Sequence, residues 1–204
     1  MTIPRGTRVL ATAVLLLVAL AACSDDVDGP TASASTSPSA PASTGTTPPT
    51  PAELSTQTAE AKLREYFVVR NELRKDPSQS FSPLKQVAIS TELTAQQRVF
   101  KNARRDGVHQ TGDTEIADLK VQSVNLDSSD PKAGRVPAVL IDVCYDVSGV
   151  DLINEDGKSV VRTDRPETGW IRYTVANFEW ESDPYGAWRV ASSQDIEQTP
   201  CVAS

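Results

Sequence analysis

The spacing of the apolar residues changes at Gly112, and this change most restricts what the chain can fold into. Between residues 53 and 105 apolar side chains recur three and four positions apart, as in Leu63, Tyr66 and Phe67, which is typical of amphipathic helices. After Gly112 they alternate with polar residues, which is typical of strands with one buried face. Helices followed by consecutive strands predict an α+β domain, with N-terminal helices packed on one curved antiparallel sheet.

Three helices are predicted. The first begins at Thr50-Pro51-Ala52-Glu53, because Thr is a good cap, Pro suits the first helical position and Glu follows the cap by three residues. It ends before Asp76-Pro77. A short second helix opens at Ser82-Pro83, and a third runs from about Thr91 to Asp106-Gly107. The side chains expected to face inward are Ala59, Leu63, Tyr66, Phe67, Arg70 and Leu73, then Leu84, Val87 and Ala88, then Leu93, Ala95, Val99, Phe100 and Ala103.

The strands are predicted from the alternating pattern. A phase slip at Gln122-Ser123 indicates a β-bulge, and Asp156-Gly157 is predicted to turn a hairpin. Val139, Ile141 and Val143 should face the helices, which places Asp142 and Cys144 on the outer face of the sheet. The predicted strands are Leu119–Leu126, Arg135–Val147, Lys158–Arg162, Gly169–Trp180 and Ala187–Ser192.

The chain starts with a segment typical of a secretory signal peptide, residues 1–22. Arg5 and Arg8 precede the apolar run 9–22, which is too short to cross a bilayer as a helix. Leu20-Ala21-Ala22-Cys23 resembles a bacterial lipobox. This resemblance implies cleavage before Cys23 and a diacylglyceryl anchor on its thiol, which would hold the protein at the outer, extracytoplasmic face of the cell membrane. The alternative is a cleaved leader with an incidental cysteine.

Residues 23–51 are predicted to form a disordered tether between the anchor and the folded domain, residues 52–204. From Pro30 to Pro51 every residue is Ser, Thr, Pro, Ala or Gly, so no apolar surface offsets the entropy lost on ordering. The prolines favour extended backbone. At about 3.1 Å per residue the tether would reach roughly 90 Å from the membrane.

The three cysteines are explained together if one is lipidated. With Cys23 carrying the anchor, Cys144 and Cys201 are left to form a disulfide in an oxidising compartment. A metal site or a nucleophilic cysteine is the alternative. It has little support, because no second cysteine lies nearby and the single histidine, His109, is distant in sequence.

The order of elements resembles that of the NTF2-like cone fold, in particular the single-domain lipoproteins of high-GC Gram-positive bacteria. The resemblance spans residues 53–201 and is carried by Val143–Asp146, Asp156-Gly157-Lys158 and Trp188-Arg189-Val190. It implies a pocket between sheet and helices, with Tyr66, Phe67, Phe100 and Tyr173 as its candidate lining, and frequent pairing through the sheet face. It implies little about activity.

No catalytic, metal or cofactor motif stands out. Asp142, Asp146, His109 and the tyrosines Tyr66 and Tyr173 are the candidate proton-transfer groups. The carboxylates are expected instead to pair with Arg172 or Arg189 across strands, and His109 is expected to be exposed. We therefore assign no catalytic residue, no metal ligand and no cofactor.

Aromatic residues on the predicted strand Gly169–Trp180 form a candidate partner surface. In a continuous strand, alternate residues lie on one face, which would place Trp170, Phe178 and Trp180 together and Tyr173 on the opposite face. They could anchor an envelope protein or a second copy of the chain, or they could pack on loops at the strand ends.

Charge and motifs together favour a binding protein. The net charge of −7 argues against nucleic-acid binding, which needs a basic patch. The expected function is a membrane-anchored, non-enzymatic binding or assembly module. The alternatives are a carrier of a small apolar ligand, a less favoured isomerase-like enzyme, and an accessory of surface exclusion or conjugation.

Overall fold

The computed structural model describes residues 48–197 and residue 201. The predicted signal peptide, Cys23 and the tether as far as residue 47 lie outside the described residues. Within the described part, no helix combines the length and apolar character needed to cross a membrane.

Three helices come first, as predicted: α1 (Pro51–Lys75), α2 (Ser82–Val87) and α3 (Ser90–Arg105). Thr50 caps α1 with a complete capping box. Its hydroxyl accepts the Glu53 amide at 3.2 Å, and the Glu53 carboxylate accepts the Thr50 amide at 2.6 Å. The hydrogen bonds that the Thr50 amide and the Thr50 hydroxyl donate to the carboxylate lower the pKa of Glu53. After α3, Gly107 takes the left-handed conformation that ends the helix, with φ of 61°.

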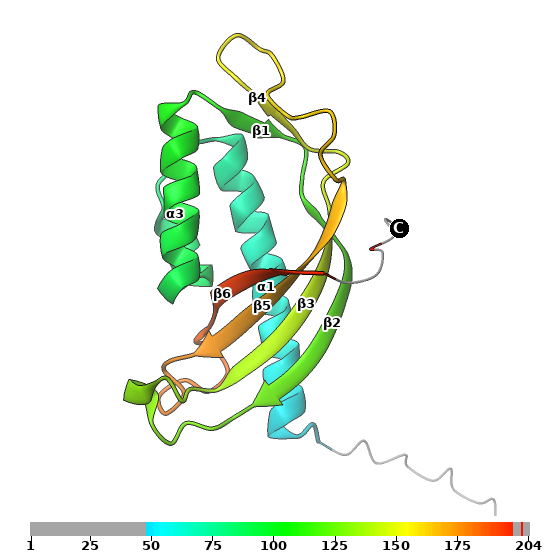
Figure 1. Ribbon diagram of the computed structural model, residues 1–204. Helices are drawn as coiled ribbons and strands as arrows, with labels where there is room; N and C mark the ends of the chain where they lie inside the picture. Colours follow the sequence, from blue (N-terminus) through cyan, green and yellow to red (C-terminus); the bar gives the residue numbers. More distant parts are fainter. Residues whose placement is uncertain (1–47, 198–200, 202–204) are drawn as a thin grey trace, which may run out of the picture. The chain divides into compact units, whose positions relative to one another are not determined.

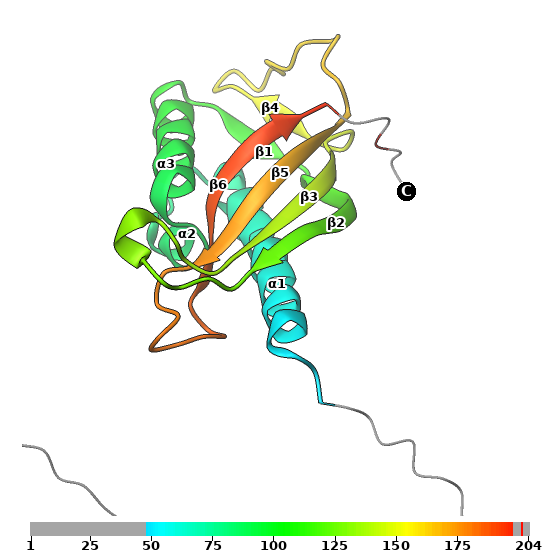
Figure 2. The ribbon, with the colours of Figure 1, turned by 60° about the horizontal axis from the view of Figure 1, so that its bottom comes forward.

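The strands form one four-stranded antiparallel sheet in the order β2-β3-β5-β6 and a separate two-stranded sheet, β1-β4. Figures 1 and 2 show the helices on one side of the curved larger sheet, and the small sheet at the end where α1 finishes. The α+β prediction is confirmed. The strand bounds are β1 His109–Thr111, β2 Glu115–Asn125, β3 Ala138–Asp146, β4 Asp151–Ile153, β5 Thr168–Asn177 and β6 Trp188–Ile196.

The predicted bulge in β2 is present as a register shift between Val121 and Ser123 against β3. A second shift, between Ile116 and Asp118, was not predicted. Bulges increase the local twist of a strand, and β2 is an edge strand of the sheet. The two bulges therefore contribute to the curvature along this edge.

Three strand predictions need correction. The Asp156-Gly157 turn forms, but segment 158–162 is no strand and only the bridge Ile153–Ser159 continues the hairpin. Strand β4 pairs instead with β1, which makes His109 a half-buried strand residue rather than an exposed loop residue. Strand β5 ends at Asn177, because the Asn177 side chain donates to the Asp183 carbonyl at 2.7 Å and accepts the Glu179 amide at 2.9 Å, which starts a turn.

The core lies between the helices and the inner face of the larger sheet. Trp188 of β6 is fully buried, and its indole N–H donates to the Pro184 carbonyl at 3.0 Å. The prediction for α3 is wrong in part: Phe100 faces inward, but Ala95 and Val99 are exposed. Their places are taken by polar residues that find partners inside the domain, Glu92 and Gln96.

Replacing Thr50 by Ala should lower the free energy of unfolding by about 1 kcal/mol, because it removes the hydroxyl that accepts the Glu53 amide, whereas the bond from the backbone amide of residue 50 to the Glu53 carboxylate can still form. Urea denaturation measures the change. Thr56→Ala is the control: its hydroxyl bonds only the Ala52 carbonyl within the same helix, so this variant should be as stable as the wild type or slightly more stable. Equal stability of Thr50→Ala and the wild type would contradict the role of the cap.

Candidate functional site

A cavity of about 210 Å³ opens between α1 and the inner face of the sheet, near the C-terminal end of the helix. Several of its lining residues are half-buried, so the cavity is accessible from solvent. No carboxylate or imidazole lies among the residues that line it. They are Phe67, Arg70, Arg74, Thr114, Tyr145, Val147, Ile171 and Tyr173.

Arg70 enters the cavity from α1 and is held by aromatic groups. Its guanidinium lies 5.2 Å from the ring centroid of Tyr66 and 5.4 Å from that of Phe67, within the range of a cation–π interaction. One terminal N–H donates to the Tyr173 hydroxyl at 3.2 Å. Burial lowers the pKa of Arg70, but the nearby acidic groups of Tyr66, Tyr173 and Glu92 outweigh burial and raise it.

Arg74 lies one helical turn after Arg70 and has fewer partners. Its Nε atom is buried without a hydrogen-bond partner, as is the Nε atom of Arg70. Neither guanidinium forms an ion pair with a described residue. Burial and the positive charge of Arg70 lower the pKa of Arg74 to about 10. Both side chains are therefore charged at neutral pH, and two like charges share one helix face.

The carboxylate whose charge acts on both arginines is Glu92 of α3, which is buried and hydrogen-bonded through both of its oxygens. Its carboxylate accepts the Tyr66 hydroxyl, the Gln96 amide at 2.8 Å and the Ser193 hydroxyl at 2.6 Å. Burial raises the pKa of Tyr66 well above its usual value, and burial also raises that of Tyr173. Glu92 thus acts on the arginines without accepting a hydrogen bond from them, and their buried Nε–H groups stay unsatisfied.

The four predicted pocket residues are all buried, but only two of them line the cavity. Tyr66, Phe67 and Tyr173 form a cluster of edge-to-face rings with centroids 5.8 to 6.0 Å apart. Phe67 and Tyr173 face the cavity, whereas Tyr66 and Phe100 belong to the packed core. Aromatic rings fill most of the space where a deep apolar pocket was expected, so the opening is small and its polar groups are arginines.

The arginines were missed as site residues, although a signal existed. Arg70 falls in the inward stripe of the first helix, between Phe67 and Leu73. A charged residue in an otherwise apolar stripe indicates either a buried ion pair or a ligand site. Arg74 lies four residues later, which places both side chains on one face.

Tyr145 forms the opposite wall because the neighbouring strand leaves room for its ring. It is paired with Gly169 of β5. A Cβ atom at Gly169 would lie 2.5 Å from the Tyr145 hydroxyl oxygen. Glycine at this position is therefore needed for the ring to lie across β5 beside the cavity.

Asp142 pairs with Arg172, as predicted, through two hydrogen bonds of 2.7 and 2.8 Å. Its side chain is completely buried, although it lies on the sheet face away from the helices. Arg189 binds Glu179 instead.

Asp146 accepts the Ser148 amide at 2.7 Å, and this bond lowers the pKa of Asp146. Neither Asp142 nor Asp146 lines the cavity.

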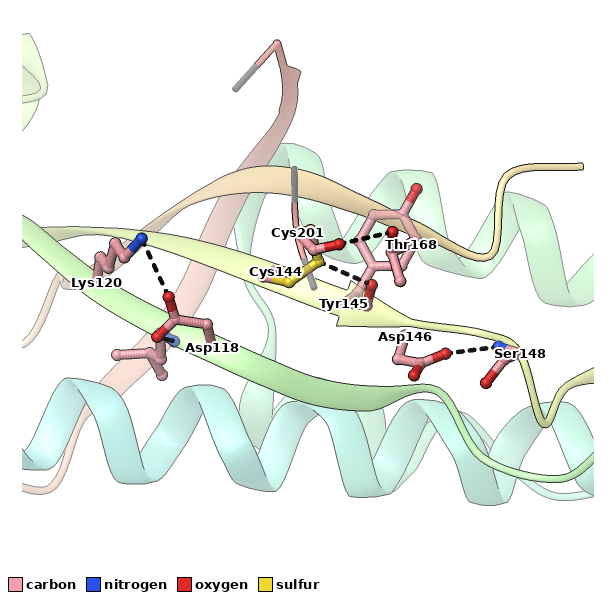
Figure 3. The surroundings of a disulfide bond; sticks show 9 residues. Asp118, Lys120, Cys144, Tyr145, Asp146, Ser148, Thr168 and Cys201 are labelled. Carbon is pink, nitrogen blue, oxygen red and sulfur yellow. Dashed lines mark hydrogen bonds and ion pairs between the residues drawn. A yellow bond between two sulfur atoms is a disulfide. The ribbon is translucent and has the colours of Figure 1, made fainter. Parts of the chain in front are cut away.

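Cys201 lies against the outer face of the sheet. Cys144 and Cys201 lie at disulfide distance, with Cα atoms 5.5 Å apart. Figure 3 shows Cys201 on the side of the sheet away from α1. The Thr168 hydroxyl also donates to the Cys201 carbonyl at 3.1 Å.

The three aromatic residues of the candidate partner surface do not form one patch. Trp170 is buried beside Cys144 on the outer face, with the Lys120 ammonium 4.6 Å from its ring centroid. Phe178 and Trp180 follow the end of β5, roughly 23 Å farther along the strand. Trp180 packs on Tyr185 and Trp188 with centroids 6.1 Å apart. The prediction of a shared face is therefore wrong, because the strand ends before Phe178.

No protein-family model matches the chain, and no curated protein matches it. The solved structures that are similar to it include the following three. The intermembrane space region of the chloroplast protein ARC6 is 18% identical, with a TM-score of 0.47 over 70% of this chain and 96% of that one. A periplasmic fragment of TraM is 11% identical, with a TM-score of 0.36 over 70% and 96%. A de novo designed β-sheet protein is 12% identical, with a TM-score of 0.33 over 71% and 92%.

Peptide mapping without reducing agent should show Cys144 joined to Cys201. The closed loop contains 57 residue steps, so Cys201→Ser should lower the free energy of unfolding by up to about 4 kcal/mol. Denaturation of the oxidised wild type with and without reducing agent gives the same comparison in one protein. Free thiols at both positions would contradict the bond.

Replacing Arg74 by Met should stabilise the ligand-free protein by about 1 kcal/mol. The change removes a half-buried cation that has no ion-pair partner among the described residues and whose Nε atom is buried without a hydrogen bond, and it keeps the apolar stem. Arg98→Met, at an exposed position of α3, is the matched control and should change stability by less than about 0.5 kcal/mol. A clear loss of stability in Arg74→Met alone would show that Arg74 has a structural partner.

Proposed function

We propose that this chain is a lipid-anchored, non-enzymatic binding module of the cell envelope, whose domain binds a small anionic ligand between α1 and the sheet. The observation that carries the proposal is the pair of half-buried arginines at the cavity. Their Nε atoms are buried without a hydrogen-bond partner, and a buried polar group without a partner is costly unless a ligand supplies one.

Binding rather than catalysis is supported by what lines the cavity. General acid–base chemistry needs a titratable group within hydrogen-bond reach of the substrate. The lining residues supply two arginines, two tyrosines and a threonine, with neither a carboxylate nor an imidazole. Arginines position anions well, but they do not release protons at neutral pH.

The arginines also distinguish this proposal from the alternatives. A carrier of a purely apolar ligand would bury both charges still further without satisfying them. The alternative of an assembly module that uses the three aromatic residues as one surface is less well supported. Trp170 is buried on the outer face, and Phe178 lies beyond the end of β5. The ligand-binding module is therefore the function that the geometry supports best.

The proposed location rests on the leader and on Cys23. The lipobox-like Leu20-Ala21-Ala22-Cys23 supports a diacylglyceryl anchor, and two acyl chains suffice for stable membrane attachment. Residues 23–51 would then hold the domain at a distance from the outer face of the cell membrane. Cys144 and Cys201 at disulfide distance suit an oxidising compartment. Three helices followed by a curved antiparallel sheet support assignment to the NTF2-like cone fold.

Native mass spectrometry of protein extracted gently from its own membranes tests the proposal. We expect the mass of a diacylglyceryl group on Cys23 and, in addition, a non-covalently bound small molecule. Arg74→Gln should lose the small molecule and keep the lipid, whereas the surface variant Arg98→Gln should keep both. Cys23→Ala should leave the membrane fraction.

Two results would overturn the proposal. Wild-type protein without a bound small molecule would contradict the ligand-binding assignment. Cys23→Ala protein that stays in the membrane pellet would contradict the lipid anchor.

A further inference from the structure

We infer that the ligand is a monoanionic carboxylate with a compact apolar body, bound with its carboxylate on Arg74 and its body against the aromatic wall. This inference rests on the proposed binding function and specifies its ligand. It is carried by the charge balance of the site, by the hydrogen-bond donors left unused, and by the size and lining of the cavity.

The charge balance leaves a single positive charge to be neutralised. Arg70 and Arg74 contribute two positive charges within one turn of α1. Glu92, the counter-charge inside the core, already accepts three hydrogen bonds from neutral groups. One bound negative charge balances the group, whereas a dianion would leave an excess of negative charge in a partly dry site.

The unused donors point to Arg74 as the main ligand contact. Arg70 is already engaged, because it donates to the Tyr173 hydroxyl and lies against two aromatic rings. Arg74 has no hydrogen bond or ion pair to any described residue, and its Nε–H is buried. The edge of a guanidinium presents two parallel N–H groups, which match the two oxygens of a carboxylate.

The other walls of the cavity suit an apolar body. The rings of Phe67 and Tyr173 and the branched side chains of Val147 and Ile171 surround the arginines. The volume of about 210 Å³ is below the roughly 300–1,000 Å³ of sites for drug-sized ligands. A small ring or a short chain therefore fits, and Thr114 leaves one hydroxyl at the wall for a further polar contact.

Saturation-transfer NMR on the full lipidated chain in nanodiscs tests the inference, with empty nanodiscs as the blank. Benzoate is the probe, benzamide is its neutral counterpart of the same shape, and inorganic phosphate is the polyvalent anion. We expect saturable binding of benzoate at least tenfold tighter than that of benzamide, and no displacement of benzoate by equimolar phosphate. Arg74→Met should abolish benzoate binding, Arg74→Lys should weaken it, and Arg98→Met should leave it unchanged.

The experiment distinguishes failure of the proposed ligand class from failure of the proposed binding function. Equal binding of benzoate and benzamide would overturn the carboxylate, and tighter binding of phosphate would overturn the monoanion, while the module would still bind a small ligand. No benzoate binding by protein that retains a small molecule in native mass spectrometry would overturn only the ligand class. If neither experiment finds a bound molecule, the binding function fails as well. Undiminished benzoate binding in Arg74→Met would overturn the role of Arg74.

Discussion

The domain depends on the packing of α1 against the inner face of the sheet. Tyr66 and Phe67 of the helix contact Tyr173 of β5 edge to face, and such aromatic contacts add to the free energy gained by burial alone. The contact aligns α1 along the sheet. It also places Arg70 and Arg74, which follow the aromatic pair on α1, at the wall of the cavity.

The same packing explains why two charges are placed where apolar residues would stabilise the fold. The α1 helix continues beyond the aromatic cluster to Lys75, and the sheet curves around it (Figure 1). At this end the core opens into the cavity. Cations near a helix C-terminus gain from the helix dipole, but the dipole offers Arg74 no acceptor for its buried N–H. Stability alone therefore does not account for the arginine.

Local signals in the sequence predicted the features that depend on neighbouring residues. The cap at Thr50, the stop at Gly107 and the bulge after Val121 each need only a few adjacent residues, and counting cysteines paired Cys144 with Cys201. The prediction of which residues of α3 face inward was wrong in part. Glu92 is buried because it accepts hydrogen bonds from Tyr66 and Ser193, which lie far away in sequence. The cavity depends on the same long-range contacts, so its volume and the missing partners of its arginines had no local signal.

The buried polar groups of the domain differ in whether neighbouring residues satisfy them. Asp142 and Arg172 satisfy each other on the outer face, and Glu92 is satisfied by neutral donors. Each of these groups is complete without a ligand. Arg74 differs from them, because its buried Nε atom has no hydrogen-bond partner and no described residue forms an ion pair with its guanidinium. An unsatisfied cation at the end of the main packing contact lowers the stability of the empty protein, and under the proposed function a bound anion would recover this cost.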